Sequence, residues 1–309
     1  MDPDILVIFQ ATENLIKQTD CHVFLESDFN RRSLPNLLEE EISNVWKIRQ
    51  SKNTTLYNGT KFRVHAVLPS VDKKGVNLQL GITCYRDFLG TNWSFRSQHM
   101  QTIGLALFGN SQACMSDPLG VGSLLLTSDQ RIILLKRSQN CAEAPGLWDI
   151  PGGHAEPQEL VGSVMMEEID VESLSPAAVV KELYNSVLRE IRDEVNIPQD
   201  MLLEPELMGI ASNLTSAGRP SLEFFVKCSL PSSEVLQLYL QGNQSEADES
   251  THIQCLSVND VLELQENNKQ LWSMLAPSAK GCFIIFINMV LNNVLKLDSN
   301  SSITNSIEP

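Results

Sequence analysis

The chain has 309 residues, of which 42% are hydrophobic and 20% charged, and its formal net charge is −15. A chain of this length can bury a full hydrophobic core, and we expect one main domain with an extension. The acidic balance argues against a surface that binds nucleic acid. It leaves a phosphate ligand open, because a bound divalent cation inverts the local field.

Cysteine usage and the chain start indicate the cellular setting. The seven cysteines are scattered without a Cys-x-x-Cys pair, which is typical of reduced thiols. Met1 to Asp4 carry no basic residue, so we expect no signal peptide. The longest apolar run, 282–287, is too short to span a membrane. We therefore expect an intracellular protein, cytoplasmic or nuclear and not secreted, that binds no membrane; protein partners stay unknown.

The first 116 residues predict an α+β unit. Alternating and apolar runs predict strands, and spacing of three and four residues predicts helices. The expected strands are 5–10, 21–25, 62–68 and 76–83, and the expected helices are 34–50 and 99–108.

One segment of this unit, Thr83–Trp93, has no period. It combines aromatic rings, a guanidinium, a carboxylate and a turn glycine within eleven residues. Such a run forms either a folded loop or the wall of a ligand site, and an aromatic ring is more often core than ligand contact.

From residue 117 the pattern changes to a hairpin, 121–127 and 130–136, with Arg137 at the strand end. A turn at 144–146 and a short strand at 147–150 lead to two glycines. Later elements include strands 208–212 and 222–229, helices 232–240, 258–264 and 278–297, an acidic loop 242–250, and a disordered tail from 299. In the last helix, Phe283, Ile284, Ile287 and Val290 are expected to face inward.

The most informative stretch begins with the glycine pair Gly152 and Gly153 and ends with an acidic helix. Two glycines let a backbone approach a ligand closely. Ser175 followed by Pro176 predicts a helix start, and Asn196 followed by Pro198 predicts its end. An apolar stripe at helical spacing lies between these caps.

Glu190, Asp193 and Glu194 share one face of this predicted helix. Like charges at this spacing cost roughly 0.2–0.5 kcal/mol per pair. A cation reverses that sign, and hard oxygen ligands suit Mg²⁺, with Mn²⁺ as a second choice. The alternative is a solvated acidic face in which Arg189 pairs with Asp193.

The two halves together resemble the Nudix box, Gly-x5-Glu-x7-Arg-Glu-U-x-Glu-Glu-x-Gly-U, where U is hydrophobic. The matching residues are Gly153, Glu159, Arg189, Glu190, Ile191, Glu194 and Ile197. Residues 160–188 number 29 where the family pattern has 7, so the box is split. Asp193 replaces a glutamate and Asn196 replaces a glycine.

This resemblance implies an α/β fold, a Nudix-type α/β/α sandwich with a mixed sheet, preceded by an N-terminal α+β extension. The expected division is 1–116 for the extension, which contributes to the substrate site, 117–298 for the Nudix domain with the split box at 153–197, and 299–309 for the tail. The insertion between the halves, 160–174, is expected to be a solvent-exposed loop.

Segments 83–93, 143–154 and 213–219 resemble Nudix hydrolases that act on UDP-hexoses. The resemblance implies Mg²⁺-dependent cleavage of UDP-glucose or UDP-galactose to UMP and hexose 1-phosphate. Glu190 and Glu194 are then metal ligands, with Asp193 as an outer or third ligand, and either glutamate can accept the water proton. The implied substrate contacts are Tyr57, Tyr85, Arg137, Ala142, Asp149, His154 and Glu156.

Two alternatives stay open at this point. The same chemistry serves an ADP-sugar, a dinucleotide or coenzyme A, and a non-catalytic Nudix-like module binds a nucleotide without cleaving it. The complete acid set argues against the second alternative.

Overall fold

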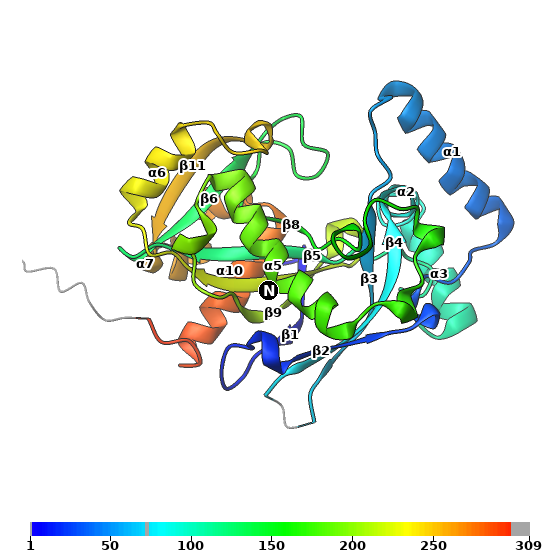
Figure 1. Cartoon of the computed structure of the whole chain (residues 1–309), viewed down its shortest axis with the longest axis horizontal. Coiled ribbons are helices and arrows are strands. Elements are labelled where there is room, and N and C mark those ends of the chain that lie inside the picture. Colours follow the sequence, from blue (N-terminus) through cyan, green and yellow to red (C-terminus); the bar gives the residue numbers. More distant parts are fainter. Residues whose placement is uncertain (1, 72–73, 298–309) are drawn as a thin grey trace, which may run out of the picture.

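The computed structural model describes residues 2–71 and 74–297, and its strands form two sheets (Figure 1). The larger sheet has eight strands in the order β1-β9-β10-β5-β6-β11, with β7 beside β6 and β8 beside β5. It is mixed, because β10 runs parallel to β5 and antiparallel to β9. The strands are β1 (Ile5–Gln10), β5 (Gly120–Leu126), β6 (Arg131–Arg137), β7 (Trp148–Asp149), β8 (Gly152–His154), β9 (Glu206–Asn213), β10 (Arg219–Lys227) and β11 (Ser250–Ser257).

Helices cover both faces of this sheet. Helix α5 (Pro176–Val195) contacts β5 and β8, while α10 (Pro277–Leu291) contacts β1, β5, β9 and β10. Every residue of β5 is buried, as expected for a strand covered on both sides. The expected α/β/α sandwich with a mixed sheet is therefore confirmed. The remaining helices after α5 are α6 (Ser232–Leu240), α7 (Val258–Leu262), α8 (Leu264–Asn267) and α9 (Lys269–Ser273).

Helix α5 begins and ends where its sequence predicts. The Ser175 side chain accepts a hydrogen bond from the Ala178 amide, and Pro176 occupies the first turn. Asn196 ends the helix in the left-handed conformation, with φ of 68°. The apolar stripe is fully buried at Val179, Leu183, Val187, Ile191 and Val195.

The N-terminal part forms a second sheet of three strands in the order β2-β4-β3. Its strands are β2 (Cys21–Leu25), β3 (Thr60–Pro69) and β4 (Val76–Cys84), and its helices are α1 (Asn36–Lys52), α2 (Tyr85–Gly90) and α3 (Ser97–Phe108). β1 does not belong to this sheet, because it pairs with β9 in the larger one. α5 contacts β2, and one hydrophobic core continues through both sheets, so residue 116 does not separate two sheets or two cores.

Several local predictions need correction. Of the two alternatives for segment 83–93, the folded loop is wrong, because the segment ends β4 and then forms α2, and three of its rings line a pocket. The sequence did not predict β8, β11 or α9. In α10, Phe283 is buried as expected, but Ile284, Ile287 and Val290 are only half-buried, and Ile285, Phe286 and Met289 lie deepest. The expected disordered tail lies outside the described residues.

The insertion 160–174 is not the solvent-exposed loop that was expected. It contains the end of α4 (Gln158–Val161) and two short 3-10 turns, and Val171 and Leu174 are buried in the main core. The Glu172 carboxylate accepts hydrogen bonds from the Ser27 amide at 3.1 Å and the Ser27 hydroxyl at 2.8 Å. The insertion therefore contacts both the main core and the N-terminal part.

We expect Val171→Ala to lower the free energy of unfolding by about 1–3 kcal/mol, because it leaves a cavity at a side chain that is 3% exposed. Val161→Ala is the matched control, since that valine is 39% exposed and should change stability little. Thermal and urea unfolding of both variants measure the difference. Equal stabilities for the two variants would mean that the insertion does not contribute to the core.

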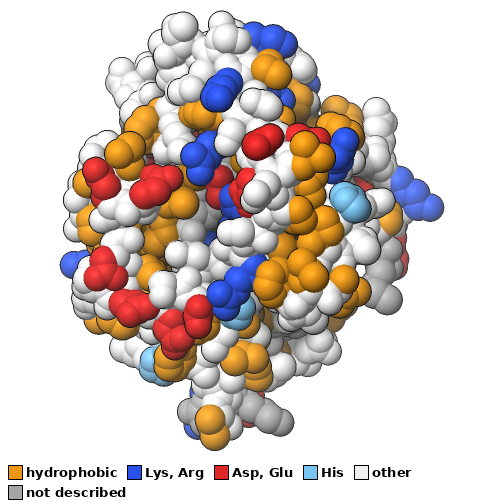
Figure 2. Space-filling model, turned by 90° about the vertical axis from the view of Figure 1, so that its right-hand side faces the viewer, with side chains coloured by type: hydrophobic (Ala, Val, Ile, Leu, Met, Phe, Trp, Pro, Cys, Tyr) orange, Lys and Arg blue, Asp and Glu red, His pale blue; other side chains and the backbone are white. Residues whose placement is uncertain are grey.

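The side of the molecule that carries α1 and α3 is seen in Figure 2. Acidic side chains gather on the left of that view, hydrophobic side chains form a band on the right, and Lys and Arg lie between them. Helices α1 and α3 expose Leu37, Ile48, Leu105, Leu107 and Phe108. Among the described residues, no helix has both the length and the apolar character that crossing a membrane requires.

Candidate active site

A pocket of about 560 Å³ lies between the two parts of the chain. The N-terminal part supplies Lys61 and an aromatic wall of Tyr85, Phe88 and Trp93. The larger sheet and its loops supply the other walls, with acidic residues gathered on one side. The site residues expected from the sequence that line this pocket are Tyr85, Arg137, Ala142, Asp149, His154, Glu156 and Glu190.

The glycine loop and the acidic helix interlock. The Gly152 amide donates a hydrogen bond to the Glu194 carboxylate at 2.9 Å, and the His154 amide donates to Glu190 at 3.2 Å. A Cβ atom at Gly153 would lie 2.2 Å from the nearer Glu190 oxygen, so a side chain there would displace the Glu190 carboxylate. The glycine pair thus brings the loop backbone against the two carboxylates and fixes their direction.

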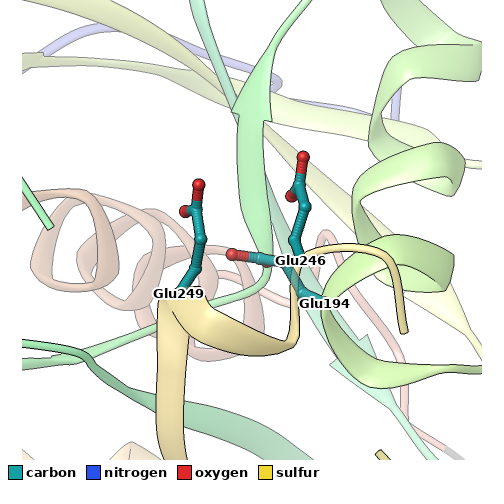
Figure 3. Close-up of side chains that lie close together, drawn as sticks. All are labelled: Glu194, Glu246 and Glu249. Atoms are coloured by element: carbon teal, nitrogen blue, oxygen red, sulfur yellow. The ribbon is translucent and has the colours of Figure 1, made fainter. Parts of the chain in front are cut away.

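Glu194 meets two further glutamates that the sequence analysis did not single out (Figure 3). One carboxylate oxygen each of Glu194, Glu246 and Glu249 lie within 4.8 Å of one another. Glu194 comes from α5 and lies across the space between Glu246 and Glu249, which extend side by side from the loop before β11. The Glu246 amide donates to the Asp193 carbonyl oxygen at 2.9 Å, which ties that loop to α5.

The electrostatics of these acids favour a cation. Burial, with the neighbouring Glu246 charge, raises the pKa of Glu190 to about 8. Burial and the Glu190 charge raise the pKa of Glu194 well above its ordinary value. Ionised carboxylates are thus costly here without a positive partner. The donors are all carboxylate oxygens, which fit a hard divalent ion.

Asp193, expected as a third metal ligand, lies outside this cluster. Arg192 donates to both of its carboxylate oxygens, at 2.8 and 2.7 Å. The alternative pairing of Arg189 with Asp193 is also wrong, because Arg189 binds Glu182, with Nη1 3.0 Å from the carboxylate. Glu182 is buried, whereas Glu159, which matches the box, is exposed on α4.

Basic side chains line the same pocket and pair with its acids. The Arg137 Nε donates to the Glu143 carbonyl oxygen at 3.0 Å, and its Nη1 lies 3.7 Å from Asp149. Lys61 donates to the Glu156 carboxylate, and Arg219 lines the pocket beside them. Lys61, Glu143 and Arg219 line the pocket as well, although none was expected as a substrate contact. Glu143 and Arg219 stand at the ends of segments 143–154 and 213–219, which carry the family resemblance, whereas Lys61 stands in a strand without a motif.

Tyr57, expected at the uracil, does not line the pocket. Its side chain is 54% exposed, and its hydroxyl lies 3.2 Å from that of Ser163 in the insertion. Tyr85 does line the pocket. Its ring lies edge-on to that of Trp46, with 6.3 Å between the ring centroids. Of the two tyrosines, the structure places only Tyr85 where a base can reach it.

Glu223 of β10 is fully buried behind Gly122 of the pocket lining, beside Ser221 and Cys282. Burial raises the pKa of Glu223 to about 8. The unfolded chain loses this proton near pH 4.5, so the contribution of Glu223 to stability falls as pH rises from there to about 8.

We expect Glu223→Gln to remove this pH dependence, because an amide has no proton to lose. The variant should gain stability relative to the parent between pH 6 and pH 9, when urea unfolding is measured at both. If the free energy of unfolding changes with pH to the same extent in both proteins over this range, the folded protein does not hold the Glu223 proton.

The mixed sheet between helices, with a glycine loop docked on an acidic helix, is the arrangement of a Nudix hydrolase, and the chain belongs to that family. It is 43% identical to the mouse uridine diphosphate glucose pyrophosphatase NUDT22 over 93% of this chain and 91% of that protein. The human protein of the same name is also 43% identical, over 93% of each chain. Nudix hydrolase 9 of Arabidopsis thaliana is 33% identical over 72% of this chain and 73% of that one.

Among solved structures, the MutT protein of Methanosarcina mazei Go1 aligns with 56% of this chain and 94% of its own, with 17% identity and a TM-score of 0.35. No family model matches the chain. Members of the family generally use divalent metal ions, and the glutamates described above fit such an ion. Carboxylate oxygens of Glu194, Glu246 and Glu249 lie close enough together that they could hold one, and the Glu190 charge acts on Glu194 beside them.

Proposed function

We propose that this protein hydrolyses the diphosphate of UDP-sugars, UDP-glucose and UDP-galactose, to UMP and hexose 1-phosphate with Mg²⁺, or Mn²⁺ in its place. One observation carries the proposal: a single pocket is lined by the glutamates Glu190, Glu246 and Glu249, by the cations Lys61, Arg137 and Arg219, and by a group of aromatic rings. Relatives at 43% identity that bear the name uridine diphosphate glucose pyrophosphatase support the choice of substrate.

In the proposed reaction, a water oxygen forms a bond to one phosphorus and the bond from that phosphorus to the bridging oxygen breaks. An ion held by Glu194, Glu246 and Glu249 would supply charge neutralisation at the phosphoryl oxygens and a lower pKa for the water. Glu190, which lines the pocket, or Glu194, which is buried beside it, accepts the water proton. Arg137 and Lys61 bind phosphoryl oxygens, and the displaced phosphate leaves as an anion.

The other pocket residues orient the two ends of the substrate. Tyr85 holds the uracil against the aromatic wall, since aromatic faces bind bases. Burial and the Lys61 and Arg219 charges keep the pKa of His154 well below its ordinary value, so its ring is neutral and offers one donor and one acceptor. His154, Asp149 and Glu156 suit hydroxyl groups, and Ala142 leaves room beside them.

The seven cysteines are all unpaired in the structure, which supports a reducing, intracellular setting. Asp193 and Tyr57 have no part in this proposal, because their side chains are engaged elsewhere.

Product analysis on a substrate panel tests the proposal. The protein is incubated with UDP-glucose, UDP-galactose, ADP-ribose, a dinucleotide and coenzyme A, with Mg²⁺ and with EDTA. We expect UMP and hexose 1-phosphate from the UDP-sugars, no turnover in EDTA, and recovery when Mg²⁺ is restored. If another compound is cleaved preferentially, the assignment of UDP-sugars as the substrate is wrong. If nucleotides bind but none is cleaved, the assignment of the protein as an enzyme is wrong.

A further inference from the structure

Arg219 is a buried cation with unused hydrogen-bonding capacity. It begins β10, its side chain is 8% exposed, and the exposed part faces the pocket. A Cβ atom at residue 120 would lie 2.8 Å from Nη1, so Gly120 leaves the space that the guanidinium occupies. The turn before it is fixed from the N-terminal part, because Asn92 and Gln112 donate to the carbonyl oxygens of residues 216 and 217.

The guanidinium has five N–H donors, and few are satisfied. Nη2 donates to the Glu143 carboxylate at 3.1 Å, and Nη1 lies 3.5 Å from His154 Nε2. Nε has no hydrogen-bond partner among the described residues. A buried arginine that serves only to stabilise the fold normally has its donors filled, since an unpaired buried donor costs about 1–3 kcal/mol.

Its single carboxylate partner comes from a loop. Glu143 lies in the segment 138–147 between β6 and β7, and its side chain is 26% exposed at the pocket. Asn213 and Ser216 lie 3.4 Å from the same Glu143 oxygen, so one oxygen carries all of these contacts. A carboxylate oxygen in this position resembles the oxygen of a bound phosphate.

We propose that Arg219 binds the diphosphate of the substrate, and that Glu143 occupies the guanidinium only until the nucleotide displaces it. The inference rests on the proposed function for the identity of the nucleotide, but its chemistry requires only a diphosphate. A planar fork with free donors matches two phosphoryl oxygens. The two residues of the ion pair then act in opposite directions: Arg219 strengthens substrate binding and Glu143 competes with it.

Calorimetric titration separates this role from a structural ion pair. The probes are α,β-methylene-UDP, which cannot be cleaved at the diphosphate, methylenediphosphonate, which lacks uridine, and uridine, which lacks phosphate. We expect Arg219→Ala to lower the affinity for both diphosphate probes by about 10- to 100-fold and to leave the affinity for uridine unchanged. Arg219→Lys keeps the positive charge but lacks the planar pair of donors, so it should lose less affinity for the diphosphate probes than Arg219→Ala. Glu143→Ala should bind the diphosphate probes more tightly than the parent.

Arg131→Ala is the matched control, because it removes the same charge from an exposed arginine at the start of β6, outside the pocket lining, and should change no titration. Thermal melting of each variant shows that it folds. The proposal is overturned if Arg219→Ala binds the diphosphate probes as the parent does, or if Glu143→Ala weakens them as much as Arg219→Ala. An enzyme specific for another base would still give the expected result with methylenediphosphonate, so failure of the substrate assignment is distinguishable.

Discussion

Glu194→Gln is expected to fold normally and to lose at least about 100-fold in the rate of UDP-glucose hydrolysis, the scale of removing one catalytic electrostatic group. The amide keeps a carbonyl oxygen for the Gly152 hydrogen bond, so the glycine loop should stay in place. It removes a negative charge from the group formed with Glu246 and Glu249, so Mg²⁺ should bind more weakly. Rate, Mg²⁺ affinity and melting temperature are measured on the same preparation.

Asp193→Asn provides a control one residue away. It removes the same charge from the same helix, but its carboxylate is paired with Arg192 and lies outside the cluster. We expect nearly parental activity and Mg²⁺ affinity. The melting temperature of Glu194→Gln without metal should equal or exceed that of the parent, because the substitution relieves a buried carboxylate beside Glu190. If Asp193→Asn lost as much activity and Mg²⁺ affinity as Glu194→Gln, the assignment of Glu194, Glu246 and Glu249 as the metal site would be wrong.

Local signals made the centre of the fold predictable. The caps Ser175 and Asn196 and the stripe between them depend only on nearby residues, and α5 follows them at both ends. The spacing of Glu190 and Glu194 on that helix likewise follows from its period. The glycine pair was identified, although its structural reason is the approach of Glu190 to Gly153.

Contacts between distant segments could not be predicted in this way. Glu246 and Glu249 reach Glu194 only because β11 pairs with β6 and returns the preceding loop to the end of α5. The sequence shows that loop only as an acidic stretch, which is most often solvated surface. Within α5, Arg189 was expected to pair with Asp193, four residues later. It pairs instead with Glu182, seven residues earlier. The burial of the insertion was not predicted either, because Val171 belongs to no helical or strand periodicity in the sequence.

Tyr85→Ala is expected to lower kcat/KM for UDP-glucose by roughly 1–3 kcal/mol, the scale of one stacked base, and to leave Mg²⁺ affinity unchanged. The reason is its place on α2, where it lines the pocket together with Phe88 and Trp93 and does not belong to the carboxylate cluster proposed to hold the metal ion. A site that selects uracil in this way should lose discrimination against ADP-sugars as it loses affinity for UDP-sugars. Steady-state kinetics on both substrate classes measure this.

Two variants make the interpretation specific. Tyr85→Phe keeps the ring and should retain most of the activity, whereas Tyr57→Ala removes a tyrosine that is half-exposed and outside the pocket and should change neither substrate. Because the Tyr85 ring also contacts Trp46 and Phe88, its loss will lower the melting temperature somewhat. A purely structural tyrosine would reduce the turnover of every substrate together with stability. Loss confined to uridine substrates, at a temperature where the variant is folded, would instead assign base selection to the N-terminal part of the chain.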